Sequence, residues 1–389
     1  MGVSPKLARL VALAIMLPAS HAYAPPPDAA PPINPPGSAI APQGTTLVQM
    51  WSEQISLDAT QIPVQVTARF RMRNTSLSAE SMDVRFPLQH PYTDNLGGYE
   101  GEIDDFTVFV DAIETPTEEL LEPVSLNDNR PPILWATFPV TFPPGKDVLI
   151  QARYSVYPSS APVSTIHALN YVLETGAGWH GPIELVQLAV TLPYQATLEN
   201  VRTGLLDEAI WRHPRWSGPT LEWTVWHVEP TPKDNFQLWI VPTELWTEVL
   251  QARQAASRVG RTAADFVRLS QAYFSVGSDH KTNACHSPIC RLALQAAEAV
   301  IRLFPSSGDA LAQRAWMRFV LASHGSDWPI LFPRTDEDKA RLLDLQCEII
   351  RALDLDPTSA TARQLREWTG AGEATQECRA RDASLTPAP

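Results

Sequence analysis

An acidic stretch in the first third of the sequence carries side chains that could bind a metal ion. The segment from Phe86 to Asn129 contains eleven Asp and Glu residues and no Lys or Arg. Carboxylates on a loop between strands suit calcium, a hard cation that prefers several oxygen ligands. The stretch does not match the EF-hand pattern, so a solvated acidic loop is the alternative, and no other cofactor is indicated. The candidate calcium ligands are Asp94, Glu100, Glu102, Asp104 and Asp105.

The four cysteines could form disulfides or hold a metal, and all of them lie in the C-terminal part of the sequence. An even number of cysteines in an exported chain indicates two disulfides, and three pairings are open. We favour Cys285–Cys290 with Cys347–Cys378, because the first two lie in one short loop that Pro288 turns. The alternatives are free thiols and a zinc site of non-standard spacing, with the ligands His280, Cys285, His286 and Cys290.

Tryptophans form a third group of candidates, since six of the twelve fall between Trp211 and Trp246. Exposed indole rings could stack on sugar rings or on the prolines of a partner, whereas buried ones would only pack the core. Trp223 alternates with Leu221 and Val225 and is therefore predicted to be a core residue. The candidate binding surface consists of Trp179, His180, Trp211, Trp216 and Trp226.

Signatures of known enzymes are missing from the sequence. It contains no Gly-x-Ser-x-Gly elbow, no His-Glu-x-x-His motif, no phosphate loop and no dinucleotide fingerprint. The adjacent carboxylates of Asp104 and Asp105 would point to opposite faces of a strand and could not share one substrate. We therefore expect a protein that is not an enzyme.

The N-terminus has the features of a secretory signal peptide over residues 1–24. Lys6 and Arg9 precede an apolar run from Leu10 to Leu17, and Ala22-Tyr23-Ala24 resembles a cleavage site. A short membrane anchor is the alternative, although the run is too short to span a bilayer. A proline-rich linker follows at residues 25–43. We expect an extracytoplasmic protein, periplasmic or secreted, with no membrane span after cleavage.

The net charge of −13 argues against some classes of partner. Proteins that bind nucleic acids need a basic face that displaces counterions, and anionic membrane surfaces attract basic segments. A protein or peptide partner is expected, and a carbohydrate is the alternative.

Residues 44–242 alternate between apolar and polar side chains, as half-buried strands do. Val64, Val66, Ala68, Phe70 and Met72 form one dry face, and the side chains between them include arginines. Similar sets recur about ten times with proline and glycine turns between them. The pattern predicts an antiparallel β-sandwich, either a single one or two subdomains divided near residues 158–162.

Residues 243–370 change to helical periodicity, and residues 371–389 are predicted to be a tail. Proline follows two of the predicted helices, at Pro305 and Pro357, where it stops a helix. The chain is therefore expected to be an α+β multidomain protein. The predicted helices are Glu244–Val259, Thr262–Val276, Ile289–Phe304, Asp309–Ser323, Asp336–Leu355 and Ser359–Trp368.

The helical part resembles degenerate tetratricopeptide repeats. The residues that carry the resemblance are Phe266, Leu269, Ser270 and Tyr273 in a first helix, then Ala293, Ala297, Val300 and Pro305, and again Leu345, Ile349, Ala352 and Pro357. Arg314 and Arg318 depart from the repeat unless the register slips by one residue. The resemblance implies helix pairs that bind a protein or peptide, and a plain helical bundle is the alternative.

The β part is similar to uncharacterised bacterial extracytoplasmic sandwich domains, through the segments Tyr171–Gly176 and Trp179–Ile183 together with Trp223, Trp226, Pro230 and Phe236. That similarity implies no chemistry. From these observations we expect a non-catalytic exported protein of the cell envelope that acts as an interaction or scaffold protein. A calcium-dependent or carbohydrate-binding adhesion module is the alternative.

Overall fold

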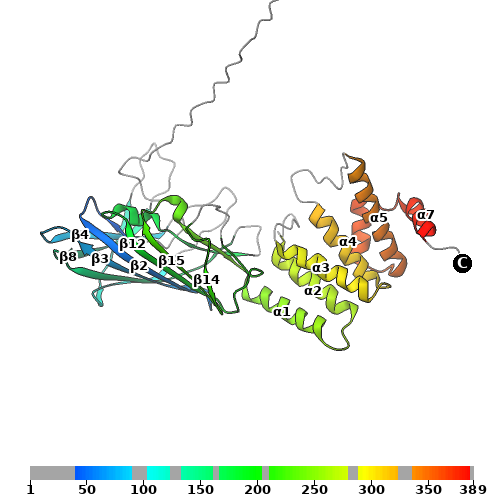
Figure 1. Ribbon diagram of the computed structural model, residues 1–389, viewed down its shortest axis with the longest axis horizontal. Helices are drawn as coiled ribbons and strands as arrows, with labels where there is room; N and C mark the ends of the chain where they lie inside the picture. Colours follow the sequence, from blue (N-terminus) through cyan, green and yellow to red (C-terminus); the bar gives the residue numbers. More distant parts are fainter. Residues whose placement is uncertain are drawn as a thin grey trace, which may run out of the picture. The chain divides into compact units, whose positions relative to one another are not determined.

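The computed structural model describes residues 40–89, 103–122, 133–160, 166–203, 210–278, 288–322 and 335–385. The predicted signal peptide and most of the proline-rich linker lie outside these residues. β-sheets occupy the N-terminal part and helices the C-terminal part (Figure 1), which confirms the predicted α+β class. None of the helices in the described ranges is both long and apolar enough to cross a membrane.

An eight-stranded sheet is the largest element, in the order β14-β15-β12-β2-β3-β9-β5-β6. All of its neighbouring strands are antiparallel except β2 and β12, which run parallel. The predicted antiparallel arrangement thus holds for every pair of this sheet except that one. The strands are β2 (Val48–Asp58), β3 (Val64–Asn74), β5 (Ile103–Val110), β6 (Ile113–Thr115), β9 (Asp147–Val156), β12 (Ile183–Thr191), β14 (Arg215–Ser217) and β15 (Thr220–Val228).

Two four-stranded sheets cover the apolar side of the large sheet. The first has the order β1-β4-β8-β7, with β1 (Ala41–Pro42), β4 (Glu80–Gln89), β7 (Glu118–Glu122) and β8 (Ile133–Phe142). The second has the order β10-β11-β16-β13, with β10 (Ser159–Ser160), β11 (His167–Tyr171), β13 (Val201–Thr203) and β16 (Phe236–Ile240). Side chains from all three sheets form one continuous core.

Strict alternation places the side chains of the large sheet. In β3, Val64, Val66, Ala68, Phe70 and Met72 are buried, whereas Arg69 and Arg71 between them are exposed. The predicted dry and cationic faces of this strand are thus confirmed. The apolar face packs against both small sheets, for example through the rings of Phe86 and Tyr154, whose centroids are 5.2 Å apart. The opposite side, which we call the outer face, meets solvent.

Seven helices occur in the part of the chain that the structure describes, and they pack in pairs. Six of them match the predicted helices to within two residues. Capping boxes begin α2 at Thr262 and α5 at Thr335, which satisfies backbone donors at those helix ends. The helices are α1 (Thr243–Ser257), α2 (Ala263–Gly277), α3 (Pro288–Leu303), α4 (Gly308–Ala322), α5 (Asp336–Leu355), α6 (Ala360–Thr369) and α7 (Thr375–Leu385).

Helix α7 lies in the segment that was predicted to be a tail. Its sequence contains few apolar residues and no apolar stripe, so periodicity could not reveal it. A disulfide between Cys347 of α5 and Cys378 of α7 connects it to the other helices. This confirms one of the two favoured pairings. Cys290 is also disulfide-bonded, which excludes it as a free zinc ligand, and Cys285, His280 and His286 lie outside the described residues.

The register of α4 differs by one residue from the repeat pattern. Gln313 and Met317 are buried, whereas Arg314 and Arg318 lie at the side of the helix and both bind Glu348 of α5. The slipped register keeps the arginines out of the apolar interior. The Glu348 carboxylate is 4% exposed, so the two guanidinium groups balance a buried charge.

Candidate functional site: the outer face of the large sheet

The predicted calcium ligands are only partly within the described residues. Asp94, Glu100 and Glu102 lie outside them, and Asp104 and Asp105 are exposed on β5. A bulge between Asp104 and Thr107 interrupts the pairing of β5 with β9, and Asp105 has a positive φ of 55°. The simple alternation expected for this carboxylate pair therefore does not hold. Within the ranges that the structure covers, no three His, Cys, Asp or Glu residues are grouped for a metal ion.

The predicted aromatic surface is divided by the structure. Trp179 and Trp211 are each 4% exposed, and their indole N–H groups donate to the carbonyls of Ile40 (2.8 Å) and Asp234 (2.7 Å). The prediction that they form part of an exposed surface is therefore wrong. Trp216 and Trp226 are 39% and 68% exposed. His180 is exposed on a turn and lies far in sequence from Trp216 and Trp226. Trp223 is buried, as predicted.

The outer face of the large sheet brings polar side chains from distant strands into rows. Gln187 of β12 pairs with Gln54 of β2, which pairs with Arg69 of β3, which pairs with Gln151 of β9. The Gln54 amide donates to the Gln187 carbonyl over 2.9 Å, and the Arg69 guanidinium donates to the Gln151 carbonyl over 2.9 Å. Neighbouring strands are about 4.8 Å apart, so such side chains lie close enough to bind one ligand.

A hollow of about 550 Å³ lies over these rows. Three of the residues around it, Ile55, Leu188 and Trp223, are at most 3% exposed because their side chains point into the core. The side chains that face the hollow are therefore almost all polar. They are those of Gln54, Ser56, Thr67, Arg69, Gln187, Ala189, Arg215, Glu222 and Thr224.

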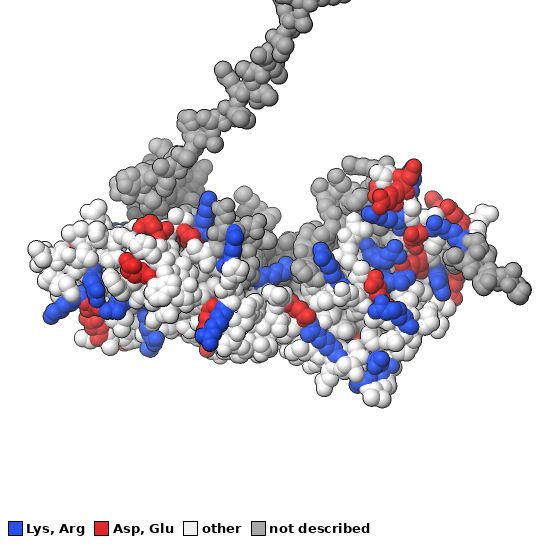
Figure 2. Space-filling view, viewed as in Figure 1, with Lys and Arg blue, Asp and Glu red and all other residues white. Residues whose placement is uncertain are grey.

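Arginines supply the charge of this face. Arg69 has no carboxylate partner among the described residues, and the Arg215 guanidinium lies 3.8 Å from the Glu222 carboxylate. Arg153, which follows Gln151 on the same side of β9, lies over the ring of Phe109 at 5.0 Å. Figure 2 shows Lys and Arg side chains next to Asp and Glu side chains at several places on the β-sheet part. Neither Arg69 nor Arg153 is paired with a carboxylate from the described residues, so each can accept an anion.

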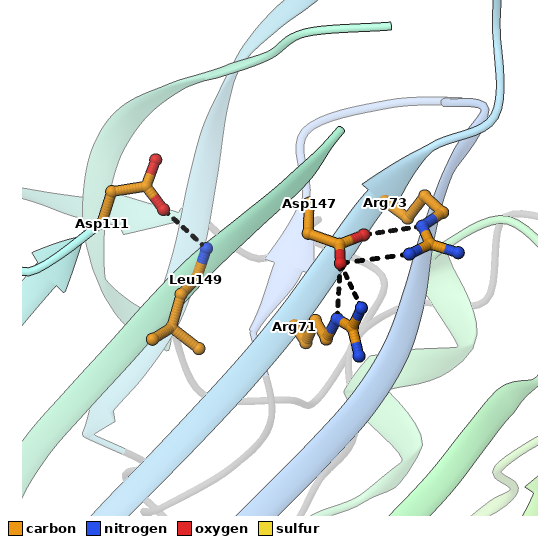
Figure 3. Close-up of polar contacts among 5 residues, drawn as sticks. All are labelled: Arg71, Arg73, Asp111, Asp147 and Leu149. Atoms are coloured by element: carbon orange, nitrogen blue, oxygen red, sulfur yellow. Dashed lines mark hydrogen bonds and ion pairs between the residues drawn. The ribbon is translucent and has the colours of Figure 1, made fainter. Parts of the chain in front are cut away.

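Asp147 pairs with two further arginines on the same face (Figure 3). Its carboxylate accepts hydrogen bonds from Arg73 Nε (2.6 Å) and from Arg71 Nε (2.6 Å). The hydrogen bond from Arg73, and then that from Arg71, hold the pKa of Asp147 below its usual value, although partial burial opposes them. The Arg73 guanidinium also lies 4.6 Å from the ring centroid of Trp51. Arg71 and Arg73 are thus already paired.

Glu53, a buried acid, precedes Gln54 on β2, and its side chain lies on the opposite side of the sheet. The register of β2 shifts between Met50 and Ser52, so Glu53 points into the core instead of outward. Its Oε1 accepts a 2.5 Å hydrogen bond from the Tyr171 hydroxyl, and its Oε2 has no hydrogen-bond partner in the described part of the chain. Burial raises the pKa of Glu53 to about 8, against the smaller opposite effect of the Tyr171 hydrogen bond.

Sequence reasoning identified the arginines of β3 as a wet face but not the hollow. The register between β2, β3 and β12 decides which side chains share it, and that register joins residues far apart in sequence. The signal for the hollow that the sequence did contain is the repeated Gln, Ser and Thr between the apolar residues of these strands.

Comparisons with known proteins give no family. No protein-family model and no curated protein sequence matches the chain. Among solved structures, it is similar to a proposed nutrient-binding protein from Legionella pneumophila, with 18% identity over 82% of this chain and 98% of that chain and a TM-score of 0.42. It is also similar to an M1 zinc metallopeptidase from Deinococcus radiodurans (9% identity, 83% and 94% covered, TM-score 0.27) and to yeast LTA4 hydrolase (7% identity, 79% and 52% covered, TM-score 0.28). At these values, none of them supports a ligand or an activity for this chain.

Proposed function

We propose that this chain is a non-catalytic extracytoplasmic binding protein, and that the outer face of its large sheet binds an anionic ligand. The observation that carries the proposal is Arg69, an exposed arginine at the hollow whose described partner is the neutral amide of Gln151. A guanidinium group presents a planar set of donors that matches a carboxylate, sulfate or phosphate group. Arg215 and Arg153 add charge beside it.

The composition of the hollow supports binding rather than catalysis. Glu222 is the one acidic residue that lines it, and its carboxylate faces Arg215, so there is no pair of carboxylates for general acid–base chemistry. The hydroxyls of Ser56, Thr67 and Thr224 share the hollow with no His, Cys or Lys from the described residues. The remaining groups are hydrogen-bond donors and acceptors that suit recognition.

Calorimetric titration of the full chain with two probes tests this proposal. Hexagalacturonate and hexaglutamate are each titrated at low and at high NaCl concentration. We expect at least one of them to bind, and its affinity to fall at high salt because exposed charges are screened. Arg69→Ala and Arg215→Ala should each weaken binding about ten-fold. Arg268→Ala, which removes an exposed arginine of α2, is the matched control and should bind like wild type.

The helix pairs offer a second candidate function, the docking of a protein or peptide. Helix α4 contacts α2 and α6 as well as α3 and α5, so these helices pack side by side. Aromatic rings follow the same three helices: Trp316 of α4 lies 6.0 Å from Phe274 of α2 and 5.7 Å from Trp368 of α6. Trp368 is 41% exposed. If this cluster binds a partner, Trp368→Ala should abolish a crosslink from the native envelope that Arg268→Ala retains.

A further inference from the structure

An exposed tryptophan stands on the same face as the hollow. Trp226 of β15 pairs with Leu185 of β12, and Leu185 pairs with Ser52 of β2. These three residues form the row next to that of Gln187 and Gln54. Thr224, two residues earlier on β15, lines the hollow. Residues two apart on a strand point to the same side, so the Trp226 ring lies at the margin of the hollow. At 68% exposure, much of its surface is available to a ligand.

The neutral groups of the hollow favour a carbohydrate over a peptide. The cores of protein interfaces are apolar and rich in aromatic and Met residues, whereas the side chains facing this hollow are amides, hydroxyls and charges apart from Ala189. Sugars present many hydroxyls, which match amide and hydroxyl side chains, and an apolar C–H face, which packs on an aromatic ring. Gln54, Gln187 and Trp226 together offer both kinds of contact.

The arginines of the outer face favour a ligand that carries negative charge. Arg215, Arg69 and Arg153 come from β14, β3 and β9, so they are spread across the sheet rather than gathered at one point. From β14 to β9 there are five strand spacings, or ~24 Å, which is the length of a short oligosaccharide. A chain with repeated acidic groups could meet these arginines in succession.

We propose that the ligand of the outer face is a linear acidic carbohydrate that crosses the strands, with an acidic group at Arg69 and a sugar ring on Trp226. This inference rests on the proposed function of the face as an anion-binding surface. The amides of Gln54 and Gln187 bind sugar hydroxyls between these two points.

The test compares three probes of six residues each on the full chain: hexagalacturonate, the neutral cellohexaose and hexaglutamate. We expect hexagalacturonate to bind at least ten-fold more tightly than either of the others. Trp226→Ala should weaken hexagalacturonate binding about five-fold. Trp216→Ala is the matched control, because its register partner Leu221 points into the core and Trp216 therefore does not belong to the outer face. Circular dichroism and the Tm establish that each variant is folded.

Three results would overturn the inference, and they differ in whether the proposed anion-binding function also fails. If hexaglutamate binds as tightly as hexagalacturonate, with loss in Arg69→Ala and no effect of Trp226→Ala, the carbohydrate inference is wrong and the proposed anion-binding function stands. If neither acidic probe binds at low salt, both are wrong. Tight binding of cellohexaose that is insensitive to Arg69→Ala would also overturn the acidic requirement.

Discussion

The carboxyl group of Glu53 owes its position to one extra residue in β2. The register shift between Met50 and Ser52 reverses which side chains face inward, so Glu53 falls in phase with Ile55 and Leu57. A bulge has this effect because the side-chain period of a strand is two. The result is an acid, fully buried, with a pKa of about 8 and one hydrogen bond to Tyr171.

This buried acid predicts that stability falls as pH rises. The pKa of Glu53 is about 4.5 when the carboxyl is solvated and about 8 in the folded protein, so the unfolded state loses the proton first. The free energy of unfolding should therefore decrease between about pH 4.5 and pH 8, by an amount on the order of 4 kcal/mol, and then level off. Glu53→Gln should remove most of this dependence while its amide oxygen still accepts from Tyr171. Urea unfolding at pH 5 and pH 9 measures the difference, and Glu114→Gln, at an exposed position, should leave it as in wild type.

Asp147 allows a test in which binding improves. Asp147→Asn should free Arg71 and Arg73 and raise the affinity for hexagalacturonate about three-fold, at a stability cost of less than ~1 kcal/mol because the pair is solvent-exposed. Asp111→Asn is the control: it changes the net charge equally, but the Asp111 carboxylate accepts from the Leu149 backbone N–H and holds no arginine in Figure 3. Equal gains from the two variants would show that net charge alone is responsible.

For individual residues, the sequence predicted the direction of the side chain wherever apolar and polar residues alternate without a break. Arg69 and Arg71 point outward as expected, and Trp223 points inward. Glu53 and Asp105 were not predictable, because each lies at a register shift that has no signature in the sequence. The burial of Trp179 and Trp211 was not predictable either, because the backbone carbonyls that accept from their indole N–H groups come from distant segments.

Helices and strands were predictable in proportion to the strength of their own periodicity. Helices α2 to α6 combine helical periodicity with a cap or a following proline, α1 begins directly after Pro242, and the long strands alternate cleanly. Helix α7 has neither an apolar stripe nor a strong cap, and β2 and β12 pair in parallel across many intervening residues. Pairing over such a sequence separation depends on the whole sheet, so local pattern cannot reveal it.

The attachment of α7 predicts a specific protease sensitivity. An isolated helix of this length is marginal in water, and α7 is held by the Cys347–Cys378 disulfide and by ion pairs of Arg379 with Asp354 and of Arg381 with Asp344. In the loop-closure model, a disulfide across 31 residues contributes about 3–4 kcal/mol. The double variant Cys347→Ser, Cys378→Ser should therefore release α7, and trypsin should cut at Arg379 and Arg381 at least ten times faster. Peptide mass spectrometry measures this, and unchanged rates would mean that α7 packs without the bond.

Over the whole molecule, the buried apolar side chains of the sheets and those of the helices form separate clusters. Tyr194 packs against both clusters, but they share no buried side chain, so we expect two unfolding transitions in calorimetry. Ile150→Val, in β9, and Ile349→Val, in α5, remove the same methylene from fully buried sites. Each should cost about 1 kcal/mol and lower only its own transition. A single transition that both variants shift equally would show that the sheets and helices unfold as one unit.

The parallel pairing of β2 with β12 has a consequence for the newly made chain. A chain that emerges from its N-terminus can assemble β2, β3, β5, β6 and β9 once residue 156 is free, but the other edge of β2 must wait for β12 to appear. Until then β2 presents a row of unpaired N–H and C=O groups, which other strands can join. Contacts between segments so far apart in sequence also form slowly. The middle of the finished sheet is therefore an open edge in the growing one, and the period before β12 arrives is when this chain is most exposed to misassembly.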